Sequence, residues 1–188
     1  MRLAGLFSRP PTGDPADALP AEAEGPSAPE VPPTPDVPRE AVILAFANQK
    51  GGVAKTTSTL NLAVALSEEG YKVLIVDMDP QGNLTMSQGF NPDQIDRSMF
   101  DVLVHRLPID QVIQHAEVDL AVSSIDLAGA ELALSSMIGR ERALEKALNP
   151  IKERYDFILV DTPPSLGLLT INALVASSGV IVPVQCEY

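Results

Sequence analysis

The chain has 188 residues, enough for one medium-sized domain, and a formal net charge of −12. Such an acidic chain binds nucleic acid poorly in bulk, so DNA binding by these residues needs a local basic patch and is expected to be weak and salt-sensitive. A single cysteine, Cys186, excludes an internal disulfide and favours a reducing, cytoplasmic setting, and no apolar run approaches the roughly 20 residues of a membrane span.

The first 40 residues differ in composition from the rest of the chain. Ten of the 17 prolines fall before residue 40, together with many Ala, Glu, Asp and Ser residues. This composition cannot bury enough apolar surface to offset the entropy that ordering the backbone costs. We therefore predict a disordered arm over residues 1–40 and a single folded domain over residues 41–188.

A strand, a glycine turn and a helix open the predicted domain. The apolar run at residues 42–47 predicts a strand buried on both faces, and residues 56–69 predict a helix that Gly70 ends. Residues 48–57 lie between and at the start of these elements. A helix N-terminus after such a turn points several backbone N–H groups at one spot and adds partial positive charge there. The sequence therefore predicts a phosphate cradle.

Further strands and helices alternate along the rest of the chain. We expect strands at residues 72–77, 118–122, 157–161 and 180–184, and helical segments at residues 98–106, 109–115, 127–148 (interrupted near Gly139) and 166–178. This alternation predicts an α/β fold with a doubly wound, mostly parallel sheet in three layers, with helices on both faces. We assign no chemistry to residues 91–114.

Three loops with charged residues follow three of these strands, at the edge where open α/β sheets bind ligands. A phosphate-loop nucleotide hydrolase needs a lysine on the outer phosphates, a hydroxyl on Mg²⁺ and an acid at a neighbouring strand end. Lys55, Thr56 and Asp161 meet these demands in order. Asp79 or Asp77 is available to orient water, and for Asp77 alone a structural role is as well supported as a functional one.

The loop departs from the strict phosphate-loop pattern, because Gln49 and Ala54 occupy the positions of its two outer glycines. The run Lys-Gly-Gly-Val-Ala-Lys-Thr at residues 50–56 instead resembles the deviant Walker A motif of the ParA/MinD superfamily of SIMIBI-class ATPases. Residues 76–83 resemble its switch I loop, and residues 160–165 resemble its Walker B and switch II segments. Residues 125–131 and 183–188 are similar to the chromosomal ParA (Soj-type) branch. The likeness begins at about residue 42, and relative to the family the chain is expected to be truncated at its C-terminus.

The resemblance implies a P-loop NTPase fold, ATP and Mg²⁺ as ligands, and roles for particular residues. Lys50 reaches across an ATP-dependent homodimer to the partner's phosphates, Thr56 ligates Mg²⁺ directly and Asp161 holds it through water. Asp79 positions the attacking water, and Asp77 supports it. The implied nucleotide-binding residues are Lys50, Gly51, Gly52, Val53, Ala54, Lys55, Thr56 and Thr57. At Ala54, where most relatives have glycine, two interpretations stay open: the methyl group alters nucleotide affinity or dimer closure, or the site tolerates it.

At the level of the cell, the resemblance implies a ParA-type ATPase that partitions chromosomes or plasmids. It further implies weak Mg²⁺-dependent hydrolysis and a ParB-like activator. It also implies non-specific DNA binding through a region largely absent from this chain, and a cytoplasmic, nucleoid-associated location. Two alternatives remain open. One is a MinD-like or other cargo-positioning ATPase, and the other is a truncated nucleotide-binding module without turnover.

Overall fold

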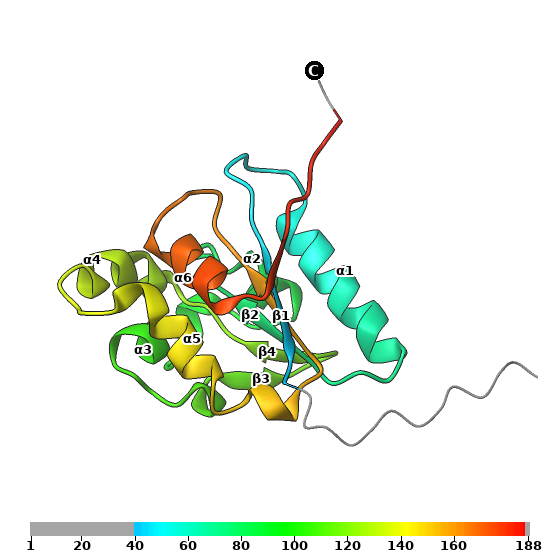
Figure 1. Ribbon diagram of the computed structural model, residues 1–188, viewed down its shortest axis with the longest axis horizontal. Helices are drawn as coiled ribbons and strands as arrows, with labels where there is room; N and C mark the ends of the chain where they lie inside the picture. The colour runs from blue at the N-terminus through cyan, green and yellow to red at the C-terminus, as the bar shows by residue number, and fades with distance from the viewer. Residues whose placement is uncertain (1–39, 187–188) are drawn as a thin grey trace, which may run out of the picture. The chain divides into compact units, whose positions relative to one another are not determined.

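The computed structural model describes residues 40–186, so the arm predicted for residues 1–40 lies outside the described residues except for Glu40. A six-stranded sheet with the order β3-β4-β2-β5-β1-β6 forms the centre of the domain (Figure 1). Its strands are β1 (Val42–Phe46), β2 (Val73–Asp77), β3 (Ile113–His115), β4 (Asp119–Ala121), β5 (Phe157–Asp161) and β6 (Gly179–Ile181). All neighbouring pairs are parallel except β3 and β4. The prediction of an α/β fold with a mostly parallel sheet is confirmed.

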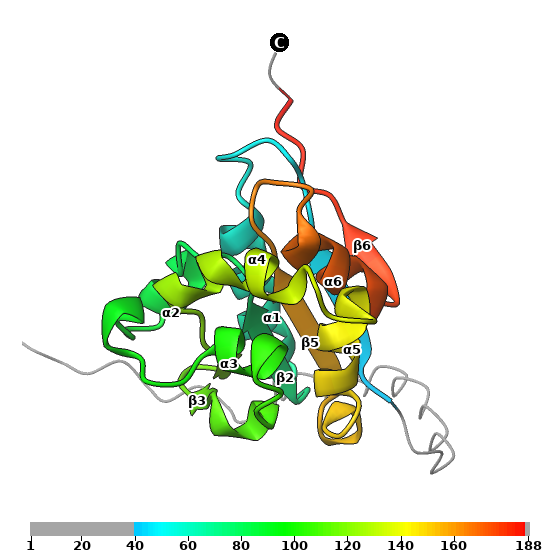
Figure 2. The same cartoon turned by 90° about the vertical axis from the view of Figure 1, so that its left-hand side faces the viewer.

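Helices cover both faces of this sheet. They are α1 (Lys55–Glu68), α2 (Asn83–Ser87), α3 (Met99–Val104), α4 (Ala130–Leu134), α5 (Ala143–Leu148) and α6 (Leu168–Ala176). Short 3₁₀ turns lie at η1 (Pro92–Gln94), η2 (Ile109–Gln111), η3 (Ile125–Gly129), η4 (Arg140–Arg142) and η5 (Lys152–Arg154). In Figures 1 and 2, α1 lies on one face, whereas α3, α4, α5 and α6 lie on the other. The arrangement has the three predicted layers.

The two strands β2 and β5 form the centre of the core. Every residue of β2 is buried, as are the last four residues of β5. Continuous apolar runs of this kind are expected where helices cover both faces of a parallel sheet. The central position of β2 and β5 therefore explains their apolar sequences. Both strands end in a buried aspartate.

One predicted element is wrong. Residues 109–115 were expected to be helical, but they form the short turn η2 and then β3, which pairs antiparallel with β4 in the register Ile113↔Ala121. The tight connection to β4 lets this segment complete the edge of the sheet, and that tertiary pairing overrides a weak local helical pattern. The sheet consequently has six strands rather than the five expected.

Two other predicted elements are shorter than expected. The helical pattern at residues 127–148 is divided into η3, α4, η4 and α5, with Gly139 in the left-handed region at φ +69°. Strand β6 ends at Ile181 rather than at residue 184. Pro183 follows two residues later and has no N–H group to donate to a strand ladder, which limits further pairing.

Among residues 40–186, no helix is long and apolar enough to cross a membrane.

The central position of β5 makes its side chains the most costly to truncate. We expect Leu159→Ala to lower the free energy of unfolding by about 3 kcal/mol, because Leu159 is fully buried and its loss leaves a cavity. Val180→Ala on the edge strand β6 removes a side chain that is 48% exposed and should cost less than about 1 kcal/mol. Urea denaturation of both variants measures the difference, and equal losses would contradict the central placement of β5.

Candidate functional site

The strand register brings the three predicted loops together. Phe46 at the end of β1 pairs with Asp161 at the end of β5, and Asp161 pairs in turn with Asp77 at the end of β2. Figure 1 shows the loop after β1 and the loop after β5 rising at the same edge of the sheet. The residues that follow these three neighbouring strands therefore share one site.

The loop at residues 48–54 turns sharply and leaves space above its glycines. Gly52 and Ala54 have φ values of +74° and +61°, and helix α1 begins at the next residue, Lys55. An added Cβ atom at Gly51 or Gly52 meets no atom within 4 Å. The backbone at this turn is thus open to a bound group, as a phosphate cradle requires.

Side chains from distant parts of the sequence hold this loop. Asn48 Nδ2 donates to the Pro183 carbonyl at 2.8 Å, and Asn48 Oδ1 accepts from the Lys50 N–H at 2.9 Å. Gln185 Nε2 donates to the Gly52 carbonyl at 3.0 Å. The segment after β6 therefore supports the loop, and neither Asn48 nor Gln185 was identified as a support from the sequence.

The two lysines of the loop lie in different surroundings. Lys55 is only 7% exposed, whereas Lys50 is exposed. Among the other predicted nucleotide-binding residues, Val53 is buried, Thr56 is half-buried, and Ala54 and Thr57 are exposed. A buried lysine at a helix start can serve a phosphate bound in the same subunit, while an exposed one remains available to another molecule.

Thr56 and Asp161 lie in direct contact. Thr56 Oγ1 donates to Asp161 Oδ2 at 2.6 Å, and the other carboxylate oxygen of Asp161 is buried without a hydrogen-bond partner among the described residues. Burial raises the pKa of Asp161 to about 7, against the lowering effect of the Thr56 hydrogen bond and with further raising by the charges of Asp77 and Asp79.

This pair has the chemistry of a magnesium site. A hydroxyl oxygen and a carboxylate oxygen are hard ligands that suit Mg²⁺, which is usually bound by one or two protein groups, water and substrate phosphates. The unpartnered buried oxygen of Asp161 is a costly feature that a cation or its water shell would satisfy. The residues present therefore fit Mg²⁺.

Asp77 and Asp79 face different partners. Asp77 accepts from the Asp79 N–H at 3.1 Å and from the N–H and hydroxyl of Thr85 at 2.9 and 2.7 Å. Burial raises the pKa of Asp77 to about 6, although the Thr85 hydrogen bonds oppose the shift. Asp79 accepts from the Gln81 N–H at 2.9 Å through one carboxylate oxygen. The geometry thus favours a supporting role for Asp77.

Sequence reasoning missed two buried hydroxyl residues, Thr85 and Ser123, that support the loop after β2. Thr85 Oγ1 accepts from the Ser123 N–H at 3.0 Å, and Ser123 Oγ donates to the Asp79 carbonyl at 2.8 Å. Ser123 directly follows the strand predicted at residues 118–122, at the same sheet edge as the acids, and that position was a usable signal. Thr85 lies inside α2, and no sequence pattern identifies its role.

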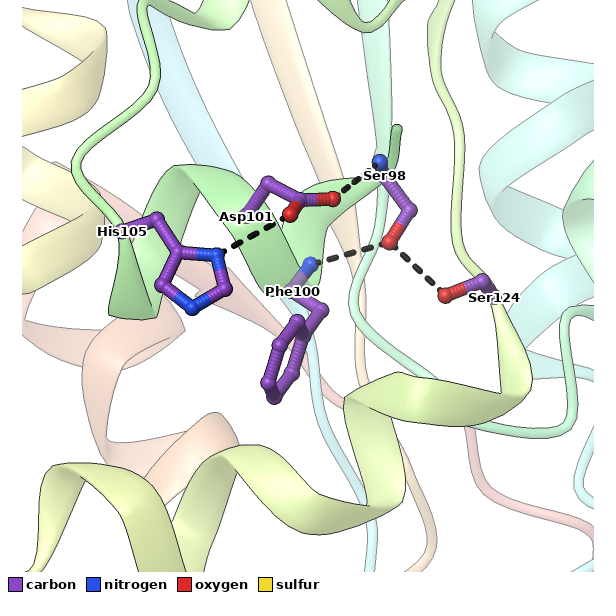
Figure 3. A network of polar contacts seen from close by, with 5 residues as sticks. All are labelled: Ser98, Phe100, Asp101, His105 and Ser124. Carbon is purple, nitrogen blue, oxygen red and sulfur yellow. Dashed lines mark hydrogen bonds and ion pairs between the residues drawn. The ribbon is translucent and has the colours of Figure 1, made fainter. Parts of the chain in front are cut away.

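The segment after β4 is also anchored to α3, as Figure 3 shows. Ser98 Oγ lies 2.7 Å from Ser124 Oγ and accepts from the Phe100 N–H, while Asp101 accepts from the Ser98 N–H at 3.0 Å and contacts His105. Ser98 and Asp101 form a capping box, a motif that satisfies the free N–H groups of a helix start. The network fixes the position of the segment that carries Ser123 and Ser124.

Comparison with known proteins agrees with this geometry. The AAA domain family matches residues 41–188. The Soj sporulation initiation inhibitor protein of Bacillus subtilis is 48% identical over 149 residues, which cover 78% of this chain and 59% of that protein. A solved Borrelia burgdorferi plasmid partition protein is 31% identical with a TM-score of 0.68, over 77% of this chain and 65% of the other.

A third relative was solved with ligands. The Mycobacterium smegmatis structure described as cobyrinic acid a,c-diamide synthase with bound ATP analog and magnesium is 46% identical with a TM-score of 0.77, over 79% of this chain and 62% of the other. The fold and the strand-end loops are those of a P-loop NTPase domain. It belongs to the ParA/MinD superfamily of ATPases, close to chromosomal ParA. The chain spans between half and two thirds of the length of the curated relatives it matches.

Ala54 should be strained, because an L-residue in the left-handed region pays about 1 kcal/mol that glycine does not. We expect Ala54→Gly to raise the free energy of unfolding by about 1 kcal/mol. Ala65→Gly, at an exposed position inside α1, is the matched control and should lower it by about 1 kcal/mol. Chemical denaturation gives both values, and destabilisation by Ala54→Gly would show that the loop is not strained there.

Thr85 joins Asp77 to Ser123 through its hydroxyl. We expect Thr85→Val to lower the free energy of unfolding by about 2 kcal/mol, because the buried Ser123 N–H and the Asp77 carboxyl each lose a partner. Thr85→Ser keeps the hydroxyl and should cost about 1 kcal/mol for the lost methyl group. Denaturation curves compare the two, and a larger loss for serine than for valine would count against the hydroxyl's role.

Proposed function

We propose that this chain binds Mg²⁺-ATP at the edge formed by β1, β5 and β2 and acts as the nucleotide-binding part of a ParA-type partitioning ATPase. The observation that carries the proposal is the contact of Thr56 with Asp161, whose second carboxylate oxygen is buried and has no hydrogen-bond partner within residues 40–186. Family membership and the bound ATP analog and magnesium of the M. smegmatis relative support the same assignment. We also propose that the folded domain begins near residue 41.

In this proposal each residue of the loop has a separate task. Backbone N–H groups of residues 51–57 and the Lys55 ammonium hold the phosphates, while Thr56 supplies a hydroxyl ligand to the metal and Asp161 holds the metal through water. When bound, Mg²⁺ neutralises phosphate charge. Lys55 is 7% exposed, and a partly desolvated cation is attracted to phosphate more strongly than one in bulk water.

Hydrolysis needs a water held near the outer phosphate. Asp79 is the candidate for this task, because one of its oxygens is occupied by the Gln81 N–H while Asp77 is fully engaged with Asp79 and Thr85. Ser123 fixes the Asp79 backbone and Asp77 fixes its N–H, so the carboxylate is positioned by two buried contacts. Asp77 acts in this proposal as a positioning residue.

The exposed Lys50 supports an ATP-dependent homodimer. Its backbone N–H donates to Asn48 Oδ1, and its side chain is exposed, in contrast to that of Lys55. A lysine so placed can contribute positive charge to the phosphates of a second copy, as an arginine finger does in trans. Dimer formation and hydrolysis then alternate, with ATP favouring the dimer.

The wider cellular role rests on the named relatives, which include partitioning proteins. We propose that a ParB-like protein stimulates hydrolysis, that the full-length dimer binds DNA without sequence preference, and that the protein works in the cytoplasm on the nucleoid. Measuring ATP hydrolysis with and without DNA and a ParB-type protein tests this role. Stimulation of hydrolysis by DNA and the ParB-type protein supports the partitioning role. Hydrolysis that is stimulated only by another cargo protein indicates a cargo-positioning ATPase. ATP binding without any turnover indicates a nucleotide-binding module.

The two lysines should separate binding from dimerisation. Lys55→Ala is expected to abolish measurable nucleotide binding, because the phosphates lose their buried cation. Lys50→Ala carries the same charge change but should bind nucleotide as a monomer within about threefold of the wild type and fail to dimerise. Titration with a fluorescent ATP analogue and light scattering measure both properties. Wild-type affinity in Lys55→Ala contradicts the cradle assignment.

Asp79→Ala should bind ATP, lose turnover and accumulate as a dimer, because hydrolysis no longer resets the bound state. Light scattering with ATP and Mg²⁺ measures the dimer, and phosphate release measures turnover. A variant that stays monomeric with ATP while the wild type dimerises would count against the switch. Omission of Mg²⁺ is the control and should prevent turnover in the wild type.

A further inference from the structure

The other face of the domain contains an apolar cavity that the nucleotide site does not use. It has a volume of about 320 Å³ and lies among α3, the segment after it, the stretch between α4 and η4, and α5, elements that face the viewer in Figure 2. Its wall includes the buried side chains of Val102, Leu103, Ile109, Leu134 and Ile151. A water in the liquid occupies about 30 Å³, so the cavity has room for roughly ten non-hydrogen atoms.

Positive charge surrounds this cavity. Arg106, Arg140 and Lys146 line it, and none of the three forms an ion pair with a carboxylate of residues 40–186. The acidic residue among the lining residues, Asp110, is paired with Arg154. Three cations without carboxylate partners are notable in a chain whose net charge is −12. Charge complementarity therefore favours an anionic group at the opening.

Arg106 adds an independent observation. It follows the end of α3 with φ +57°, a position where glycine is usual and where another residue pays about 1 to 2 kcal/mol. The strain of an arginine at this position in the cavity wall is explained if its side chain binds a ligand. The exposed Ile138, at 97%, adds apolar surface beside the same opening.

We propose that this cavity binds a small amphipathic anion, with an apolar body of about ten non-hydrogen atoms in the cavity and a carboxylate or phosphate group held by Arg106 and Lys146. Pockets of this size, mostly apolar with a few polar groups that fix orientation, are typical of small-molecule sites. The lining residues include none of those assigned to the nucleotide site, so this proposal does not depend on the function proposed above.

Decanoate and decyl phosphate are suitable probes, and decanol is the neutral control of the same length. Isothermal titration calorimetry below the micelle concentration should show saturable binding of at least one anion, roughly tenfold tighter than decanol. Lys146→Gln should weaken the anion by roughly tenfold. Lys72→Gln has the same charge change at a separate cavity and should bind as the wild type does.

Arg106→Gly separates a binding role from a structural one. It should weaken the anion by roughly tenfold while raising the unfolding midpoint, because glycine accepts the left-handed backbone without strain. Ala147→Phe should fill the cavity and abolish binding. The proposal is overturned if neither anion binds saturably, if decanol binds as tightly, or if Arg106→Gly and Lys146→Gln both bind as the wild type does. Binding only of an acidic peptide would also overturn it.

Discussion

The hydrogen bond between Thr56 and Asp161 joins the two elements on which the site depends. Thr56 stands in the first turn of α1, and Asp161 ends the central strand β5, 105 residues later in the chain. Their contact fixes the start of α1 against the sheet edge, and therefore fixes the direction in which the N–H groups of the glycine turn point. Thr162 reinforces the same junction by donating to the Phe46 carbonyl at the end of β1.

The cost of this arrangement is a buried acid. Desolvation disfavours the charged forms of both Asp161 and Asp77, and each pKa is raised. The two acids are compensated differently. Asp77 receives three hydrogen bonds from Asp79 and Thr85, whereas Asp161 receives one from Thr56, and its other oxygen has no partner in the part of the chain that the structure describes. A cation would supply the compensation that Asp161 lacks, and this difference is the physical basis for proposing Asp161 as the metal-binding acid and Asp77 as the supporting acid.

The sequence predicted those parts of the fold that depend on long apolar runs and on charged strand ends. Strands β2 and β5 are continuous apolar segments that end in aspartate, and their burial on both faces makes the pattern unambiguous. Strand β3 was mistaken for a helix because three residues at a sheet edge carry little pattern, and their conformation depends on pairing with β4. The length of β6, the strand at the other edge of the sheet, was overestimated for a similar reason.

The residues of the candidate site also divide into those that the sequence predicted and those that it did not. The glycine turn, Lys55 and the acids were predicted from residue types and spacing, since these chemical groups are needed at strand ends, whereas the role of Lys50 was predicted from the family resemblance. Thr85, Ser123 and Gln185 were not found, because their roles arise only from hydrogen bonds between loops distant in sequence. The sequence left two interpretations of Ala54 open. The structure adds that the backbone of this residue is in the left-handed region, directly before α1. No pattern in a single sequence reveals this conformation.

The central claim is that Thr56 and Asp161 form the metal end of a nucleotide site at the edge of β1, β5 and β2. A crystal structure of this chain with Mg²⁺ and a non-hydrolysable ATP analogue tests it most directly. We expect the metal about 2.1 Å from Thr56 Oγ1, with Asp161 in its water shell and the Lys55 ammonium on the outer phosphates. A metal and nucleotide bound elsewhere, with Thr56 still bonded to Asp161 and the glycine turn empty, would contradict the account.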